Sequence, residues 1–208
     1  MVTDMKEYKI RVLNAAPADW NDIPAALLDE TPWMKDYVPD TKAQVVFVPG
    51  DAFYARLTCR ETNPKAVYHN FFEDVYKDSC MEFFAAWDNT KPDYINIEMN
   101  SNGASLIAVG PDRNARTRID EKIEKPFCVT PSKTAETWSV TVRIPLADLA
   151  KIYGMDASVF QAGYTFRGNF YKCGDETPVE HYNMWNRVGT EAPDYHRPEY
   201  FGTLVIGE

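Results

Sequence analysis

The sequence predicts an all-β fold, an antiparallel β-sandwich of the jelly-roll or immunoglobulin-like kind with one or two short helices. Apolar and polar residues alternate with period two in several segments, whereas long stretches with the 3.6-residue period of a helix are absent. Turn signals separate these segments, and 45% of the 208 residues are hydrophobic, which is enough to bury one sizeable core. We therefore expect about eight to ten short strands in a single domain that spans residues 1–208.

The start of the chain is expected to lie at the periphery of the sandwich. Residues 8–13 and 44–48 have the pattern of short edge strands. The segment between them, residues 14–42, is rich in Asp, Pro and Trp and shows no alternation. We expect residues 1–42 to wrap around the sandwich, largely as irregular structure.

The middle of the chain shows the clearest strand patterns. Residues 52–60 and 94–100 each alternate between an apolar and a polar face, and residues 80–87 form the nearly continuous apolar run of a central strand that is buried on both faces. Asn102-Gly103 is a hairpin turn signal. Residues 104–109 are therefore expected to return beside residues 94–100.

The last third of the chain adds one helix and three strands. Residues 137–144 alternate up to a proline, after which residues 146–153 fit a short helix that ends at Gly154. Two further strands are expected at residues 163–173 and 203–206.

Composition limits the classes of partner. The net charge of -9 and the pI of about 4.9 argue against nucleic acid, whose phosphates would be repelled. No apolar run approaches the roughly 20 residues of a membrane span, so no membrane partner is expected. Residues 1–10 lack the charged and apolar regions of a signal peptide, which favours the cytoplasm unless a leader was removed.

The cysteines give no metal or haem motif, because they are widely spaced and form no CxxC pair. We expect four mostly buried free thiols, although two disulfides, which would imply export, remain an alternative. They are Cys59, Cys80, Cys128 and Cys173.

Three predicted strands carry faces that are too polar and too aromatic for a core. If the three faces share one sheet, their amide, carboxylate and guanidinium groups form a floor that can bond vicinal hydroxyls. The alternative is the ordinary solvated face of an antiparallel sheet. The residues are Arg56, Thr58 and Arg60; Tyr94, Asn96, Glu98 and Asn100; and Arg167, Asn169 and Tyr171.

Trp185 is the most informative aromatic residue. Its neighbours Asn183, Met184, Asn186 and Arg187 show no apolar alternation, so a place in the core explains it poorly. An exposed Trp in a loop favours stacking on a ligand such as a sugar ring, and packing as a loop anchor is the alternative.

Five segments, in one order along residues 43–206, resemble the family 9-like carbohydrate-binding modules. They are Arg60–Pro64, Val75–Phe84, Tyr94–Asn100 with Gly103, Trp138–Pro145 and Pro193–Gly202. The resemblance implies a β-sandwich of the DOMON type that binds a sugar without cleaving it, with a terminal sugar clamped between two aromatic side chains. Characterised members are appendages of secreted xylanases and related glycosidases, which implies a link to polysaccharide catabolism.

The resemblance also implies site residues. Trp185 matches one clamp residue, and Tyr76 is ranked above Tyr171 as the second. The remaining expected ligand-binding residues are Arg60, Glu61, Asn96, Glu98, Arg167, Asn169 and Asn186. Structural calcium is implied as well; the chain has no Asp-x-Asp-x-Asp-Gly loop, so the candidate ligands come from separate loops: Asp74, Asp78, Asp88 and Asp93.

Three other functions stay open at this point. A glycoside hydrolase would use paired carboxylates such as Glu61 and Glu98. A haem-binding DOMON relative would need an axial pair such as Met184 with His181 or Met99. A purely structural or protein-interaction sandwich would need no site at all.

Overall fold

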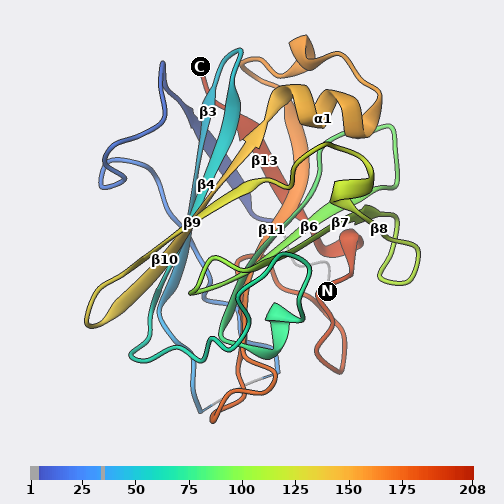
Figure 1. The fold of residues 1–208 in the computed structure, drawn as a ribbon. Coiled ribbons are helices and arrows are strands. Elements are labelled where there is room, and N and C mark those ends of the chain that lie inside the picture. The colour runs from blue at the N-terminus through green and yellow to red at the C-terminus, as the bar shows by residue number, and fades with distance from the viewer. Residues whose placement is uncertain (1–4, 34–35) are drawn as a thin grey trace.

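The computed structural model describes residues 5–33 and 36–208. Within these ranges the chain forms thirteen strands, one α-helix and four short 3-10 helices (Figure 1). The strands are β1 (Glu7–Val12), β2 (Ala26–Leu27), β3 (Thr41–Val48), β4 (Ala52–Arg60), β5 (Cys80–Ala86), β6 (Tyr94–Asn100), β7 (Ser105–Gly110), β8 (Thr117–Arg118), β9 (Cys128–Lys133), β10 (Thr137–Pro145), β11 (Thr165–Cys173), β12 (Tyr182–Met184) and β13 (Gly202–Ile206). The helices are η1 (Val75–Lys77), η2 (Ile119–Glu121), α1 (Leu146–Tyr153), η3 (Ala157–Val159) and η4 (Pro198–Tyr200). No helix in the described part of the chain has the length and apolar character of a membrane span.

The strands form two sheets that share β1. The first sheet has the order β8-β7-β6-β5-β11-β13-β1, with β12 paired to the end of β11; the second has the order β1-β3-β4-β10-β9, with β2 paired to β3. Residues 7–10 of β1 pair with β13, and residues 11–12 pair with β3. The predicted all-β sandwich with a short helix is therefore confirmed, and its likeness to DOMON domains stays a prediction.

The prediction of edge strands at residues 8–13 and 44–48 is wrong. Both β1 and β3 have a strand on each side, and β1 runs parallel to both of its neighbours. A period-two pattern shows which face of a strand is apolar but not how many neighbours it has. Parallel pairing also joins segments that are distant in sequence, such as β1 and β13.

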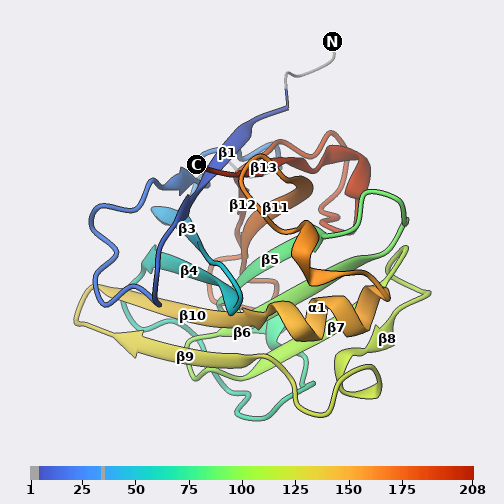
Figure 2. The same ribbon diagram turned by 90° about the horizontal axis from the view of Figure 1, so that it is seen from above.

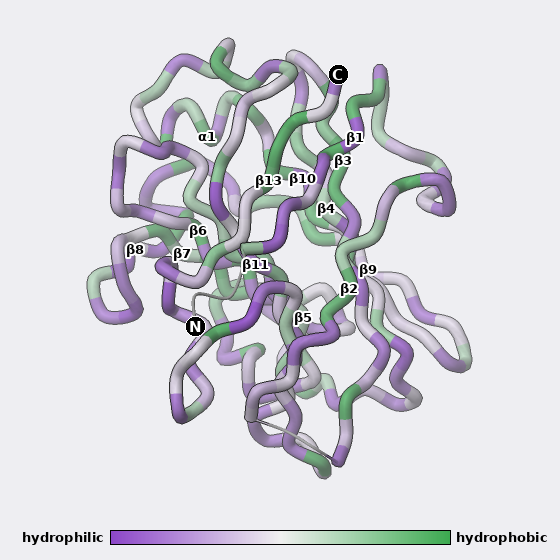
Figure 3. The backbone as a smooth tube through the Cα atoms, turned by 180° about the vertical axis from the view of Figure 1, so that it is seen from behind, coloured by the Kyte–Doolittle hydropathy of each residue, from purple (hydrophilic) through white to green (hydrophobic). Residues whose placement is uncertain are grey.

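The main core lies between the two sheets, and its hydrophobic segments follow the strands in Figure 3. Phe53, Trp87, Trp138 and Phe166 all have at most 1% of their surface exposed there. The ring of Trp87 stacks on Phe166 with centroids 4.4 Å apart, and Phe53 lies 4.8 Å from Trp87. Aromatic side chains from both sheets thus interlock, which stabilises the sandwich through apolar burial and ring packing.

The first sheet is covered on its other face as well. All seven residues of β6 are buried, including Asn96, Glu98 and Asn100 on the face away from the main core. A second apolar cluster, which includes Phe84, Tyr171 and Phe201, fills the space between this outer face and the loops above it. The polar face of β6 is therefore neither a solvated surface nor an open floor.

The helix confirms a local prediction. In Figure 2, α1 directly continues β10; it ends at Gly154, whose φ of 62° is the left-handed conformation that glycine adopts without strain. Trp20 and Ile23 pack on Val46 and Val48 of β3, whereas residues 7–12 form the interior strand β1. The wrapping of residues 1–42 around the sandwich stays a prediction.

Trp185 contradicts the prediction of an exposed aromatic clamp. Only 4% of its surface is exposed, and the indole belongs to the main core, where it packs edge-on to Tyr8 and tilts against Phe170. A Cβ on Gly202 would lie 2.6 Å from the indole ring. The partners of Trp185 come from β1, β11 and β13, so the residues beside it in sequence could not reveal its burial.

Replacing Trp185 with alanine should therefore destabilise the fold. We expect Trp185→Ala to lower the free energy of unfolding by about 3–5 kcal/mol, because it leaves a large cavity in a packed core. Urea denaturation measures this loss, and Val67→Ala, at a residue that is 59% exposed, is the control. A Trp185→Ala protein as stable as the control would restore the exposed-clamp hypothesis.

Candidate functional site

A cavity of about 270 Å³ opens on the outer face of the first sheet. This volume is close to the lower end, roughly 300 Å³, of the range for small-molecule sites. Its floor comes from neighbouring strands: Glu82 of β5, Glu98 of β6, Leu106 of β7 and Cys173 of β11. Its walls come from η1, β12 and the loops: Tyr76, Tyr182, Arg113, Arg116, Asp175, Pro193, Asp194, Tyr195 and His196.

Two carboxyl groups form the centre of the floor. Glu82 and Glu98 lie directly opposite each other on β5 and β6, and each is 3% exposed. Burial raises the pKa of Glu98 to about 7, although Arg116 and the amide of Asn96 oppose the rise. Burial, together with the charge of Glu98, also raises the pKa of Glu82 well above its ordinary value. The floor therefore holds groups that can donate or accept hydrogen bonds at neutral pH.

One wall of the cavity is cationic and comes from the loop between β7 and β8. The Arg116 guanidinium lies 3.6 Å from a carboxylate oxygen of Glu98, and Arg113 donates to Asp194 over 2.8 Å. His196 completes this wall: its Nδ1 lies 2.7 Å from the Tyr94 hydroxyl, and its ring packs on Phe84. Burial and the two arginines lower the pKa of His196 to about 3, so its ring is neutral.

The aromatic part of the wall consists of tyrosines. Tyr76 lies in η1 and is half-buried, with the Lys77 ammonium 5.8 Å from the centre of its ring. Tyr195 is held by Tyr171, on which it stacks with ring centres 4.0 Å apart. Flat apolar rings beside planar polar groups are the combination that suits a sugar, which has apolar ring faces and polar edges.

The structure places two of the ten predicted ligand-binding residues, Tyr76 and Glu98, in this cavity. Arg60 lies elsewhere, on the second sheet, where it is exposed and pairs with Glu136. Asn96 supports the cavity from behind, because its amide donates to Glu98 over 2.9 Å. The expected single floor made by three strands is wrong, since Arg56 and Arg60 on β4 belong to the other sheet.

Four further predicted residues hold loops in place. The Asn169 side chain donates to the carbonyl of Asn186 and accepts from its amide, while the Asn186 side chain donates to the carbonyl of Tyr200. Arg167 donates to the carbonyl of Pro198, and Tyr171 is fully buried beneath Tyr195. These residues position the C-terminal loop, and the Pro193–His196 part of that loop lines the cavity.

The cavity residues that sequence reasoning missed lie mainly in loops. Arg113 and Arg116 follow a strand whose pattern ends at Gly110, and nothing in their own neighbourhood marks them. Glu82 sits inside an apolar run, where a single acidic residue was the available signal of a special environment.

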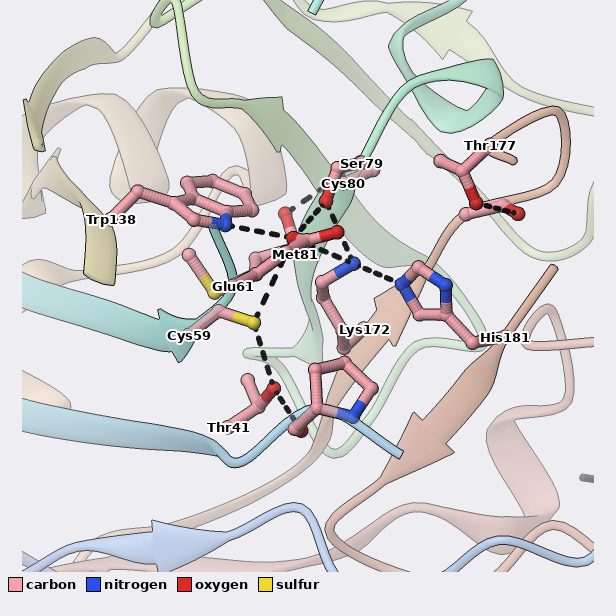
Figure 4. A network of polar contacts seen from close by, with 12 residues as sticks. Thr41, Cys59, Glu61, Ser79, Cys80, Met81, Trp138, Lys172, Thr177 and His181 are labelled. Carbon is pink, nitrogen blue, oxygen red and sulfur yellow. Dashed lines mark hydrogen bonds and ion pairs between the residues drawn. The ribbon is translucent and has the colours of Figure 1, made fainter. Parts of the chain in front are cut away.

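Glu61 lies in a different, closed network (Figure 4). It forms an ion pair of 3.6 Å with Lys172, which is completely buried, and it accepts hydrogen bonds from Ser79 and from the Trp138 indole. Lys172 also donates to Ser79 and to the carbonyl of Cys173, each over 2.9 Å, and to Nε2 of His181.

This network fixes the charge state of its members. Burial raises the pKa of Glu61, but the Lys172 ammonium and the hydrogen bonds from Ser79 and Trp138 outweigh it, so the pKa lies below its usual value. Because an ammonium only donates, Nε2 of His181 accepts and Nδ1 donates to the carbonyl of Val179. Burial and Lys172 lower the pKa of His181 to about 4.

The particular pairs predicted for catalysis and for haem binding, Glu61 with Glu98 and Met184 with His181 or Met99, are not formed. Glu61 and Glu98 lie on opposite faces of the first sheet. Glu61 pairs with Lys172, which points to one face of β11, whereas Glu98 lines the cavity together with Cys173, which points to the other face. Met99 packs in the main core and Met184 in the second cluster, and both ring nitrogens of His181 are engaged.

The predicted calcium ligands do not converge. Asp74 pairs with Lys77, Asp88 accepts from Thr90, and one oxygen of Asp78 accepts from the backbone amides of residues 67 and 68. Among the described residues, none of these aspartates, nor Asp93, belongs to a group of three side chains that meet as metal ligands. Calcium binding therefore stays a prediction.

Comparison with known proteins identifies a family and a shared fold. A model of carbohydrate-binding family 9 matches residues 14–206 of the chain. No curated protein is similar enough to count as a match. Solved structures resemble the fold, beginning with one from Bacteroides uniformis that is described as a candidate carbohydrate-binding protein, at a TM-score of 0.78 and 24% identity over 97% of this chain and 99% of the other.

Two further structures are family 9 carbohydrate-binding modules from Caldicellulosiruptor kristjanssonii. The module in complex with glucose has a TM-score of 0.69 and 12% identity over 98% of this chain and 97% of the other. The module in complex with cellotriose has a TM-score of 0.66 and 10% identity over 97% and 94%.

The closed network yields a prediction about stability. Lys172→Met should cost about 3–5 kcal/mol of unfolding free energy, because it leaves the Glu61 carboxylate without its cation. The double variant Lys172→Met/Glu61→Leu should recover part of that loss, because no charge is then left unpaired. Urea denaturation tests this, and Arg60→Met in the exposed pair with Glu136 is the control, expected to cost less than about 1 kcal/mol. Strict additivity of the two single variants would contradict it.

His196 yields a prediction about pH. The pKa of His196 is depressed to about 3 in the folded state. Below about pH 6.5 the unfolded chain therefore binds a proton that the folded chain does not. The stability that neutral His196 contributes is lost as the pH falls toward 3. The loss caused by His196→Asn should therefore shrink by up to about 1.4 kcal/mol per pH unit between pH 6.5 and 5.

Urea denaturation of both proteins at several pH values measures this difference, which cancels the titration of other groups. Val67→Ala, at an exposed position without a titratable side chain, is the control and should give the same loss at every pH. A pH-independent effect of His196→Asn would show that the histidine is not held neutral.

Proposed function

The chain belongs to carbohydrate-binding family 9, and we propose that it binds a sugar, without cleaving it, in the cavity on the outer face of its first sheet. The observation that carries this assignment is the composition of the cavity. The segment Pro193–His196, part of the C-terminal stretch that resembles the family, forms one wall, and Tyr76 and Glu98 face the same space.

Each part of the cavity has a role in this proposal. The half-exposed ring of Tyr76 covers an apolar face of the sugar, which removes apolar surface from water. Glu98, Arg116 and Asp194 bond the hydroxyls, and charged partners make these hydrogen bonds the stronger ones. Because Arg116 and Asp194 are already held by Glu98 and Arg113, little side-chain order is lost on binding.

The ligand is proposed to be a gluco-configured sugar or the end of a β-linked glucan or xylan chain. Two structural neighbours are in complex with glucose and with cellotriose, which supports this class as the first to examine. The volume of about 270 Å³ suits a single ring better than an extended chain. A role beside enzymes of polysaccharide breakdown would follow from that ligand.

The test is isothermal titration of glucose, cellobiose, cellotriose and the matching xylose oligomers. Wild type should show saturable binding, and Tyr76→Ala should weaken it about tenfold or more, since losing the burial of roughly 60 Å² of apolar surface costs about 1.5 kcal/mol. Glu98→Gln should weaken it too, because the amide changes the hydrogen-bond pattern at the centre of the floor.

Two controls make the result decisive. Arg60→Ala, on the second sheet, should leave the affinity unchanged, and chromatography of the sugars after incubation should show no cleavage, although Glu82 and Glu98 lie side by side. Unchanged affinity in Tyr76→Ala, with thermal melts that show an intact fold, would exclude the cavity as the site. A panel without any binding would contradict the proposed ligand class.

A further inference from the structure

Two thiols and a carboxyl group meet at the base of the cavity. Cys80 and Glu82 are two residues apart on β5 and therefore point to the same face of the sheet. Cys173 lies directly opposite Cys80 on β11, the neighbouring strand. The register of two adjacent strands thus brings two sulfur atoms and one carboxylate together.

The distances are those of a nearly assembled metal site. One ligand atom of each residue lies within 4.8 Å of the other two, and Sγ of Cys173 is 3.0 Å from a Glu82 oxygen. In the part of the chain that the structure describes, these three form the one such group of His, Cys, Asp and Glu side chains. A tetrahedral ion with Zn–S bonds of about 2.3 Å would need only small rotations of side chains here.

The charges at this position favour a cation. Glu82 is 3% exposed, and the ion pairs of the described residues give it no lysine or arginine, since Arg116 faces Glu98 instead. A buried carboxylate without a cation is costly. Lys172 forms an ion pair with Glu61 on the opposite face of β11, whereas Glu82 has no ion-pair partner among the described residues and the charge of Arg113 reaches it only from a distance.

The site also has an entrance. Glu82 and Cys173 both line the cavity, so an ion reaches the three ligands from solvent without unfolding of the sheet. Cys80 lies beneath them and is fully buried. Three protein ligands with a fourth position open to a cavity is the pattern of an accessible zinc site, in which solvent completes the tetrahedron.

We infer that Cys80, Glu82 and Cys173 form a binding site for a thiophilic divalent cation, Zn²⁺ in the first place. Thiolate ligands select zinc over calcium and magnesium, which take oxygen ligands. The site is distinct from any calcium site and does not depend on sugar binding.

The experiment uses the full chain, reduced and freed of metal, and titrates it with Zn²⁺ against a chromophoric chelator and with Co²⁺ by absorption spectroscopy. We expect one Zn²⁺ per chain and thiolate-to-cobalt charge-transfer absorption in the near ultraviolet. Glu82→Gln should weaken zinc binding about tenfold or more while it keeps the sulfur-to-cobalt absorption. Cys80→Ser and Cys173→Ser should each remove most of that absorption.

Two matched controls separate this site from other sources of binding. Cys128→Ser removes the exposed thiol and should leave zinc binding unchanged. Tyr76→Ala should also retain zinc, so a failed sugar site and a failed metal site give different results.

A readout on wild type covers the case in which a cysteine variant does not fold. Zn²⁺ should slow alkylation of Cys173, which lines the cavity, by iodoacetamide, measured by peptide mass spectrometry, and leave alkylation of Cys128 unchanged. Absence of stoichiometric zinc in the reduced, folded wild type would overturn the inference. So would a Cys80–Cys173 disulfide in the unreduced protein with no zinc bound after reduction, or zinc binding that only Cys128→Ser abolishes.

Discussion

Strands β5, β6 and β11 have no solvated face, and the position of the cavity depends on this constraint. Successive side chains of a strand point to opposite faces, so Phe83 and Phe170 enter the main core while Glu82 and Tyr171 point outward. The outward face is apolar enough, through Phe84 and Tyr171, to require a cover. The loops that cover it bring Tyr76 and the Pro193–His196 segment over the sheet, and the cavity is the part that they leave open.

Buried charged groups have different partners on the two faces of the first sheet. On the core side, the ammonium of Lys172 has four polar partners, and its carboxylate partner Glu61 accepts three more hydrogen bonds. Such a network is complete and stabilises one arrangement of β11. On the cavity side, Glu82 has the thiol of Cys173 as its partner, and Glu98 has Arg116 at 3.6 Å. Groups that keep unused bonding capacity next to an opening are available for a ligand.

Much of the fold follows from local sequence pattern. The alternation at residues 52–60 and 94–100 and the helix ended by Gly154 agree with β4, β6 and α1, because periodicity and glycine conformation act over a few residues. What failed was non-local: β1 and β3 are interior strands, and Trp185 is buried by partners far away in the sequence. The segment Pro193–Gly202 was found through the family resemblance, but its residues Pro193–His196, which line the cavity, were not predicted as ligand-binding residues.

The candidate site was predicted less completely for the same reason. Glu98 was visible as a polar position on an alternating strand, and Tyr76 as an aromatic residue in a matched segment. Glu82 became significant only through its register with Glu98, and Arg116 only through a loop that folds back over β6.

Such a cavity would also separate the affinity for a sugar from the specificity between sugars. In the proposed function a single tyrosine ring contributes modest stacking, so the discrimination between sugars would rest on the buried carboxyl groups. A sugar without the hydroxyl that Glu98 is proposed to bind would leave a desolvated polar group unpaired, which costs about 1–3 kcal/mol.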